Sequence, residues 1–309
     1  MTVYDKTPLS VSEQSQLLLD RGLICTDKAH LERYLTSIGY YRLSAYWLPF
    51  EQPASNGLSR RNHQFVPGTT FDKILNLYIF DRKLRLLVME AIERIEVSLR
   101  SQWSGSLALK NNNSYAYMDP TLFKCARQHI RNLAKIDREF DNSGETFIQH
   151  YKDRYNSPPF PPIWAVVETM TLGTLSHWFK NTIDVPTKKD IMKAFNMPTI
   201  DVIESVFHAL TPVRNVCAHH SRLWNRRFPI SFPQIKRFKE SLVPESSPNH
   251  QAKHLYNYLV IIVILMQAIS QNSSWKSRLI ILLDDVTPNE HKAMGFPDDW
   301  QERKLWIKS

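Results

Sequence analysis

The sequence predicts an all-α protein, on the strength of three observations. Only 8 of its 309 residues are glycine, while 18 prolines divide the chain into segments. Within these segments apolar residues recur at steps of three and four, the period of a helix with one buried face. No segment gives a competing strand signal.

The first part of the chain is expected to form short helices followed by one long helix. Residues 11–48 suit two or three short helices, with Gly22 and Gly39 as C-terminal stops. A loop then leads to Thr70, which can cap a helix over 71–109, because that stretch contains no proline.

Caps and prolines divide the rest of the chain. Ser157–Pro162 is predicted to be a rigid connector, because proline fixes φ and removes a hydrogen-bond donor. Thr211-Pro212 pairs a cap with a proline and therefore predicts the start of a new helix. The expected helices are 120–140 after the Asp119 cap, 163–180, 188–195, one from Thr199 that ends before Pro212, 213–226, 250–271, and a short one after the capping box at 287–290.

The net charge of +9 favours a polyanion as partner, with nucleic acid first. A merely basic soluble enzyme is the alternative.

Cysteine spacing and hydropathy indicate the compartment. The three cysteines are widely spaced with no CxxC pair, which argues against a zinc site or a disulfide framework. The N-terminus lacks the apolar core of a secretory signal, and the most apolar stretch, 255–269, is too short to span a bilayer. We therefore expect a cytoplasmic protein with no membrane association, metal or cofactor.

Three polar residues share one segment with a chemical pattern. A helix that starts at Thr211-Pro212 makes Arg214 its third residue, where free N–H groups favour phosphate. Asn215 and His219 are four residues apart and so share a helical face. The set offers a phosphate clamp, a hydrogen-bonding amide and a titratable imidazole.

That set suits RNA cleavage by the strand's own 2′-OH. A histidine can take the 2′-OH proton or protonate the leaving oxygen, and an arginine can stabilise charge on phosphorus. One motif gives one imidazole, so a homodimer that joins two motifs would supply both acid and base. The alternative reading is an ordinary surface face with a histidine pair, and His220 can replace His219 as the working imidazole.

The string from Arg214 to Asn225, Arg-Asn-Val-Cys-Ala-His-His-Ser-Arg-Leu-Trp-Asn, resembles the signature of Abi-like (abortive infection, AbiD/AbiF-type) proteins. Segments 38–47, 80–101 and 162–174 also match, in order, so the resemblance spans about residues 20–270.

This family is assigned to the HEPN superfamily, whose helical bundles carry an arginine and a histidine separated by four to six residues. The resemblance implies a HEPN-type bundle with an additional N-terminal helical region and helical insertions. It implies metal-independent endoribonuclease activity at a homodimer interface and a toxin-like role in phage defence. For some members it implies control by a small noncoding antitoxin RNA. Asn215 matches the polar residue that commonly follows the motif arginine.

The domain organisation that follows is an N-terminal helical region (1–69), a HEPN-type core (70–272) with inserted basic helices near 119–156, and a C-terminal tail (273–309). In HEPN bundles an acidic residue of the first long helix can approach the motif, which makes Glu96 a possible catalytic residue beside its neighbours Glu93 and Arg100; a solvated surface or an ion pair is the alternative.

Further candidates for RNA contact are basic and aromatic. A solvated basic face, or aromatics that fill the core, is the alternative for each group. The candidates are Arg222, Arg226, Arg227, Arg42, Tyr41, Arg60, Arg61, Lys124, Arg127 and Arg131. Two functions compete with RNA cleavage: a catalytically silent structured-RNA-binding protein, and a helical interaction module with no nucleic-acid role.

Overall fold

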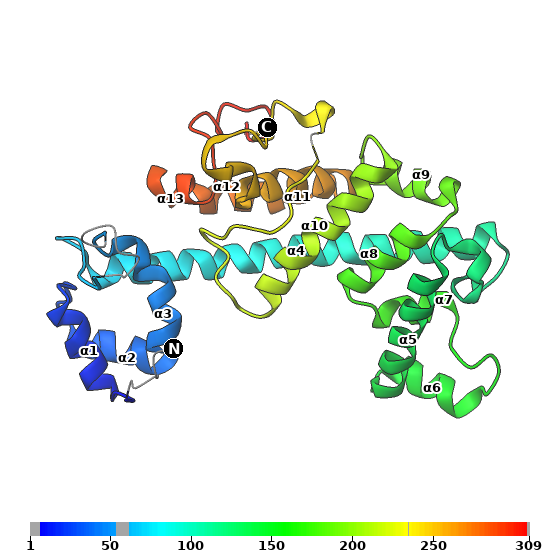
Figure 1. Cartoon of the computed structure of the whole chain (residues 1–309), viewed down its shortest axis with the longest axis horizontal. Coiled ribbons are helices and arrows are strands. Elements are labelled where there is room, and N and C mark those ends of the chain that lie inside the picture. Colours follow the sequence, from blue (N-terminus) through cyan, green and yellow to red (C-terminus); the bar gives the residue numbers. More distant parts are fainter. Residues whose placement is uncertain (1–6, 54–61, 234, 308–309) are drawn as a thin grey trace. The chain divides into compact units, whose positions relative to one another are not determined.

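The structure is a computed structural model that describes residues 7–53, 62–233 and 235–307. Within these ranges it contains α-helices and short 3-10 turns but no strand, which confirms the all-α prediction. The chain divides into two compact units, Met1–Lys83 and Leu84–Ser309. The long helix α4, Phe71–Lys110, belongs to the first unit at its start and to the second from Leu84 (Figure 1).

Three short helices precede α4 in the first unit, as predicted: α1 Val11–Asp20, α2 Lys28–Ile38 and α3 Tyr40–Trp47. The two expected glycine stops are confirmed, because Gly22 and Gly39 have φ of +87° and +89°, values that favour a residue without a Cβ.

A cap hydrogen bond and two buried aromatic side chains stabilise the first unit. The predicted cap of α4 is present, since Lys73 N donates to Thr70 Oγ1 at 3.3 Å. Tyr46 and Trp47 are buried, and the Tyr46 hydroxyl donates to the Asp81 carboxylate at 2.6 Å. These two aromatics therefore belong to the core.

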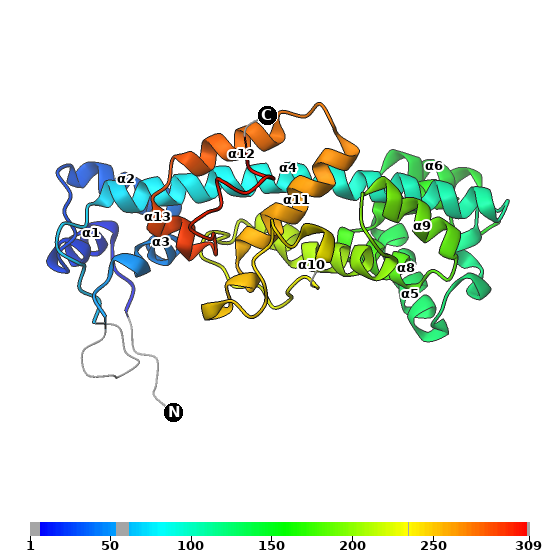
Figure 2. The same ribbon diagram turned by 90° about the horizontal axis from the view of Figure 1, so that it is seen from above.

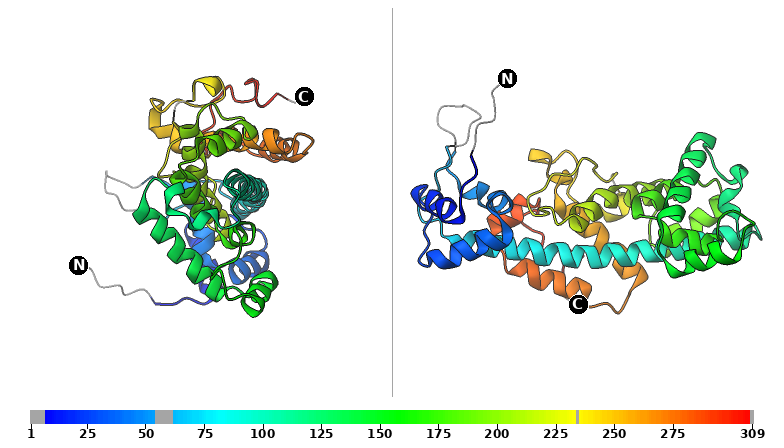
Figure 3. Two further views of the ribbon diagram at one scale, coloured as in Figure 1. Left: turned by 90° about the vertical axis from the view of Figure 1, so that its right-hand side faces the viewer. Right: turned by 90° about the horizontal axis from the view of Figure 1, so that it is seen from below.

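The second unit is built along α4 from Leu84 onward. In Figures 2 and 3, α10 and α8 lie on one side of this part of α4 and α12 on the other. Trp275 of α12 donates its indole N–H to Leu87 O at 2.7 Å, which ties α12 to α4. The helices after α4 are α5 Ala126–Asn142, α6 Thr146–Arg154, α7 Ile163–Val166, α8 Leu172–Asn181, α9 Val185–Ala194, α10 Ile200–Ala218, α11 Leu255–Ile269, α12 Trp275–Asp284 and α13 Pro288–Ala293.

The predicted helix start at Thr211-Pro212 is wrong. Helix α10 begins after its cap Thr199 and continues through Pro212 to Ala218. Proline inside a helix costs about 3 kcal/mol. Here that cost is offset because one buried stripe continues across the proline. The stripe consists of Ile203, Val206, Phe207, Leu210, Val213 and Cys217.

Other helix boundaries also differ from the predicted ones. The Asp119 cap opens only the 3-10 turn η4, Pro120–Leu122, and the basic helix starts later, as α5. The expected helix 163–180 is divided, because Thr171 caps a new start by accepting from Thr174 N at 3.3 Å. Helix α11 is shorter than predicted at both ends, and α12 lies within the expected C-terminal tail.

The capping box of α13 and the helix-free connector at 157–162 are confirmed. Among the described residues no helix is both long and apolar enough to cross a membrane.

Candidate functional site

The predicted motif lies at the C-terminal end of α10, one turn before the helix stops. His219 is the C-cap, and His220 follows in the left-handed region with φ +54°. The His220 N–H donates to Cys217 O at 3.1 Å and the Ser221 N–H donates to Val216 O at 3.0 Å. This pair of bonds is a Schellman motif, which explains why the helix ends at Ala218 rather than near residue 226.

The position of the motif changes its electrostatics. A helix C-terminus presents carbonyl oxygens and a partial negative charge, not the free N–H groups of an N-terminus. The predicted position of Arg214 at a helix N-terminus is therefore wrong. Any phosphate held here must therefore be held by cationic side chains and not by the helix itself.

The side chains of the motif retain the predicted common face. Asn215 and His219 are both exposed, and the His219 N–H donates to Asn215 O at 3.0 Å within the last helical turn. Arg214 is half-buried, with 27% of its side chain exposed. The end of α10 thus carries an open amide, an open imidazole and a partly enclosed guanidinium within six consecutive residues.

Glu96 of α4 connects the motif to the long helix. Its side chain is only 7% exposed, and its two oxygens face different arginines. Oε1 accepts from Arg100 Nη2 at 2.5 Å, and Oε2 lies 3.8 Å from Arg214 Nε. Glu93, the other acidic candidate on this helix, is exposed. Glu96 is therefore the candidate of the two that forms an ion pair with the motif arginine.

The Arg214 side chain is oriented by this carboxylate. Its Nε is buried and has no hydrogen-bond partner among the described residues, so the Glu96 oxygen is the counter-charge that faces it. Burial raises the pKa of Glu96, and the positive charges of Arg100 and Arg214 oppose that rise. The two guanidinium groups thus partly offset the effect of burying this carboxyl group.

Arg100 also binds a second segment. Its Nη2 donates to Met170 O at 2.6 Å, and its Nη1 lies 3.2 Å from Glu168 Oε2. Glu168 belongs to the 3-10 turn η5, Val167–Thr169, and is half-exposed. Sequence reasoning missed Glu168, although it is an acidic residue in an otherwise apolar segment of the matched stretch 162–174.

The basic residues after the motif remain close to it in the chain but are not helical. Arg226 Nε donates to Arg222 O at 2.8 Å, and both side chains are half-buried. Arg227 is exposed. These three extend positive charge beyond the end of α10, in a loop rather than along the predicted helix.

The remaining candidates lie elsewhere. Tyr41, which is 91% exposed, and Arg42, also exposed, belong to the first unit. Arg60 and Arg61 lie outside the described residues. The basic stripe of α5 is at the surface, since Arg127 and Arg131 are exposed while His129, Asn132 and Ile136 face inward; Lys124, just before this helix, lies 3.9 Å from Glu204.

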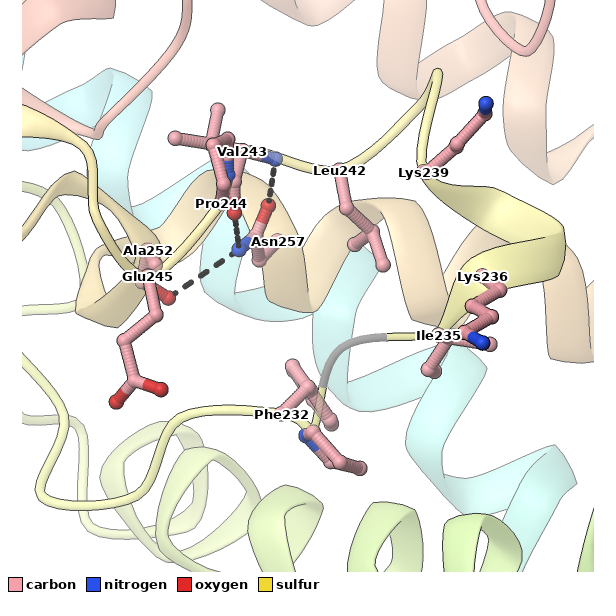
Figure 4. Close-up of a pocket in the computed structure, with 11 residues that line it drawn as sticks. Phe232, Ile235, Lys236, Lys239, Leu242, Val243, Pro244, Glu245, Ala252 and Asn257 are labelled. Atoms are coloured by element: carbon pink, nitrogen blue, oxygen red, sulfur yellow. Dashed lines mark hydrogen bonds between the residues drawn. The ribbon is translucent and has the colours of Figure 1, made fainter.

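A small pocket of about 190 Å³ contains none of these residues (Figure 4). It lies between the turn that carries Lys236 and the start of α11. Asn257 at its wall uses its amide on the backbone of Val243 and Ala252. The pocket therefore has a structural explanation and adds nothing to the site.

The comparisons with known proteins concern the same segments. A family model described as Abi-like protein matches residues 33–225, more than half of the chain, and this range includes α4 and the whole motif. The searches of curated proteins and of solved structures gave no match.

Proposed function

Because this chain belongs to the Abi-like protein family, whose description suggests a role in abortive infection as phage defence, we propose that it is the endoribonuclease effector of such a bacterial system. We further propose that it is a HEPN-superfamily protein and that it cleaves RNA without a metal. The observation that carries the proposal is the pairing of exposed Asn215 and His219 with Arg214, which a buried carboxylate holds in place.

The proposed reaction uses the RNA's own nucleophile. His219 removes the proton from a 2′-OH, whose oxygen attacks the adjacent phosphorus while the 5′-oxygen leaves with a proton from a second imidazole. The products are a 2′,3′-cyclic phosphate and a 5′-hydroxyl. Arg214 stabilises the charge that develops on the phosphoryl oxygens, and Glu96 is a positioning residue for Arg214.

A homodimer follows from this chemistry. General acid and general base must stand on opposite sides of the phosphorus. In one chain the two histidines are adjacent in sequence, at the point where α10 ends and the backbone turns. Two copies of the open face of α10, brought together, would give one imidazole to each side. The other two proposed partners are both RNA: the target strand that is cleaved, and a small noncoding RNA that restrains the enzyme.

Purified variants test the assignment. Arg214→Ala and His219→Ala should each reduce cleavage of a labelled RNA by at least about 100-fold, the usual contribution of a general acid–base or charge-stabilising group. Helix α6 offers control positions for the same two substitutions, since His150 and Arg154 are both exposed. The wild-type protein should keep its cleavage rate in the presence of a chelator. Its products should carry cyclic-phosphate ends. Unchanged rates in the two motif variants would refute the site.

The exposed basic stripe of α5 favours one second candidate, a silent structured-RNA-binding protein. It predicts RNA affinity that falls steeply with salt and no cleavage products from the wild-type protein.

A further inference from the structure

Trp164 differs from every other tryptophan of this protein. Its side chain is 55% exposed, whereas the other seven are at most 6% exposed. Tryptophan is enriched at binding surfaces, where its ring supplies a large apolar contact. The buried seven are Trp47, Trp103, Trp178, Trp224, Trp275, Trp300 and Trp306.

The exposed ring sits on a rigid base. Trp164 is in the first turn of α7, directly after the proline connector. The Ile163 N–H donates to Ser114 O at 2.8 Å, and the buried Tyr117 hydroxyl donates to Pro161 O at 2.8 Å. Because the backbone directly before the ring is held by these bonds, little backbone entropy is lost when a ligand contacts the ring.

Trp164 and Glu168, the exposed end of the ion-pair network, are both open to solvent on one short segment. Along this segment Ile163, Val166 and Val167 are buried, while Trp164 and Glu168 are exposed, one helical turn apart. Four residues of an α-helix rise about 6 Å along its axis. Glu168 contacts Arg100, which shares the Glu96 carboxylate with Arg214. A chain of direct contacts therefore runs from the motif to Glu168, which lies four residues from the exposed ring.

We propose that Trp164 is a stacking platform for an unpaired RNA base next to the cleaved phosphate. The inference rests on the proposed function and adds a nucleobase subsite to it. Aromatic rings stack on any base, and purines offer the larger surface. A nucleotide base is apolar on its faces and so suits the ring, while its anionic phosphate must be held by basic side chains outside the neutral Glu168–Arg100 pair. A contact with a second protein chain is the competing explanation.

A non-cleavable RNA gives a direct readout. A 2′-O-methyl oligoadenylate lacks the nucleophile, so binding can be measured without turnover. Because the other tryptophans are buried, quenching of the intrinsic emission on binding should come from Trp164 and should vanish in Trp164→Phe, while a duplex of the same sequence should not quench wild type. Trp164→Ala should bind the oligonucleotide roughly 5- to 100-fold more weakly, and Trp164→Phe within a few-fold of wild type.

A matched control and an abasic series sharpen the test. Ile281→Ala removes another exposed apolar side chain, 63% exposed on α12, and should leave affinity unchanged. One abasic nucleotide moved along the oligonucleotide should weaken wild type at one position and leave Trp164→Ala unaffected there. On cleavable RNA, Trp164→Ala should raise KM more than it lowers kcat.

Three outcomes separate the possibilities. If wild type cleaves RNA and Trp164→Ala has the same KM and the same quenching, the stacking subsite is refuted while the ribonuclease remains. If Trp164→Ala converts a dimer to a monomer in light scattering with RNA affinity intact, the ring is a subunit contact and the inference is overturned. If wild type neither binds nor cleaves RNA, both fail together.

Discussion

Replacing Glu96 by glutamine should separate the position of Arg214 from the stability of the fold. The substitution keeps the size of the side chain and removes the charge that faces Arg214 Nε at 3.8 Å. A guanidinium released from this contact need move only about 1 Å to cost roughly 100-fold in rate. We therefore expect kcat for RNA cleavage to fall about 10- to 100-fold, with KM unchanged or lower because the site gains positive charge.

Stability should change little, and the reason lies in the direction of the Glu96 pKa. Burial raises that pKa in the folded protein. The folded state therefore binds the proton more readily than the unfolded state, so the stability that protonation contributes is lost as pH rises through the folded pKa. At neutral pH the glutamine side chain is uncharged and so avoids the cost of burying a charged carboxylate. Arg100 keeps Glu168 and Met170 O, and partly exposed Arg214 can hydrate. We expect a change within about 1 kcal/mol, or roughly 4 °C in Tm.

The assay compares Glu96→Gln with Glu93→Gln, an exposed carboxylate three residues earlier on the same helix. Single-turnover cleavage gives the rate and thermal unfolding gives Tm. In wild type the rate should also fall on the acid side as Glu96 becomes protonated, and this part of the pH dependence should be missing in Glu96→Gln. Equal rates for the two variants, or a rate loss explained wholly by unfolding, would refute the positioning role.

Three further predictions follow from other contacts. If the two imidazoles come from two subunits, mixing wild type with His219→Ala at constant total protein should lower cleavage as the square of the wild-type fraction; a linear fall under that condition would exclude a shared site. His220→Gly should be more stable than His220→Ala by about 1–2 kcal/mol in denaturant unfolding, because φ at this position is +54°, and both should still cleave if His219 is the working imidazole. Glu204→Gln removes the charge that pairs with Lys188; the Glu204 and Lys188 side chains are 9% and 1% exposed and lie 2.5 Å apart. This change should lower the free energy of unfolding by about 3–5 kcal/mol, whereas Asp201→Asn, at an exposed position, should lower it by less than about 0.5 kcal/mol. Equal Tm values for the two variants would refute the expected cost of breaking this pair.

Local chemistry in the sequence was enough to predict most of the elements. The Thr70 cap, the glycine stops at Gly22 and Gly39 and the capping box at 287–290 depend only on neighbouring residues, and all are present. Pro212 was misread because its local signal, a cap followed by proline, is correct in isolation. The buried stripe of α10 on both sides of it belongs to the tertiary structure, and that packing decides the outcome.

The same limit applies to the site. The sequence predicts that Asn215 and His219 share a face, because that follows from four-residue spacing on one helix. It cannot show that Glu96 reaches Arg214, or that Glu168 reaches Arg100, because these pairs join segments far apart in the chain. An acidic residue on a long helix is usually solvated, as Glu93 is, and only the packing of α10 and η5 against α4 distinguishes Glu96.

The charges of the network indicate how affinity and catalysis would be divided. Arg100 and Arg214 are balanced by Glu96 and Glu168, so the four groups together are formally neutral. A neutral network at a helix C-terminus attracts a polyanion weakly. The attraction must therefore come from the basic side chains around it, on α5 and in the loop after α10, while the network sets the geometry of one guanidinium. Variants in the basic side chains should change KM and its salt dependence, and variants in the network should change kcat.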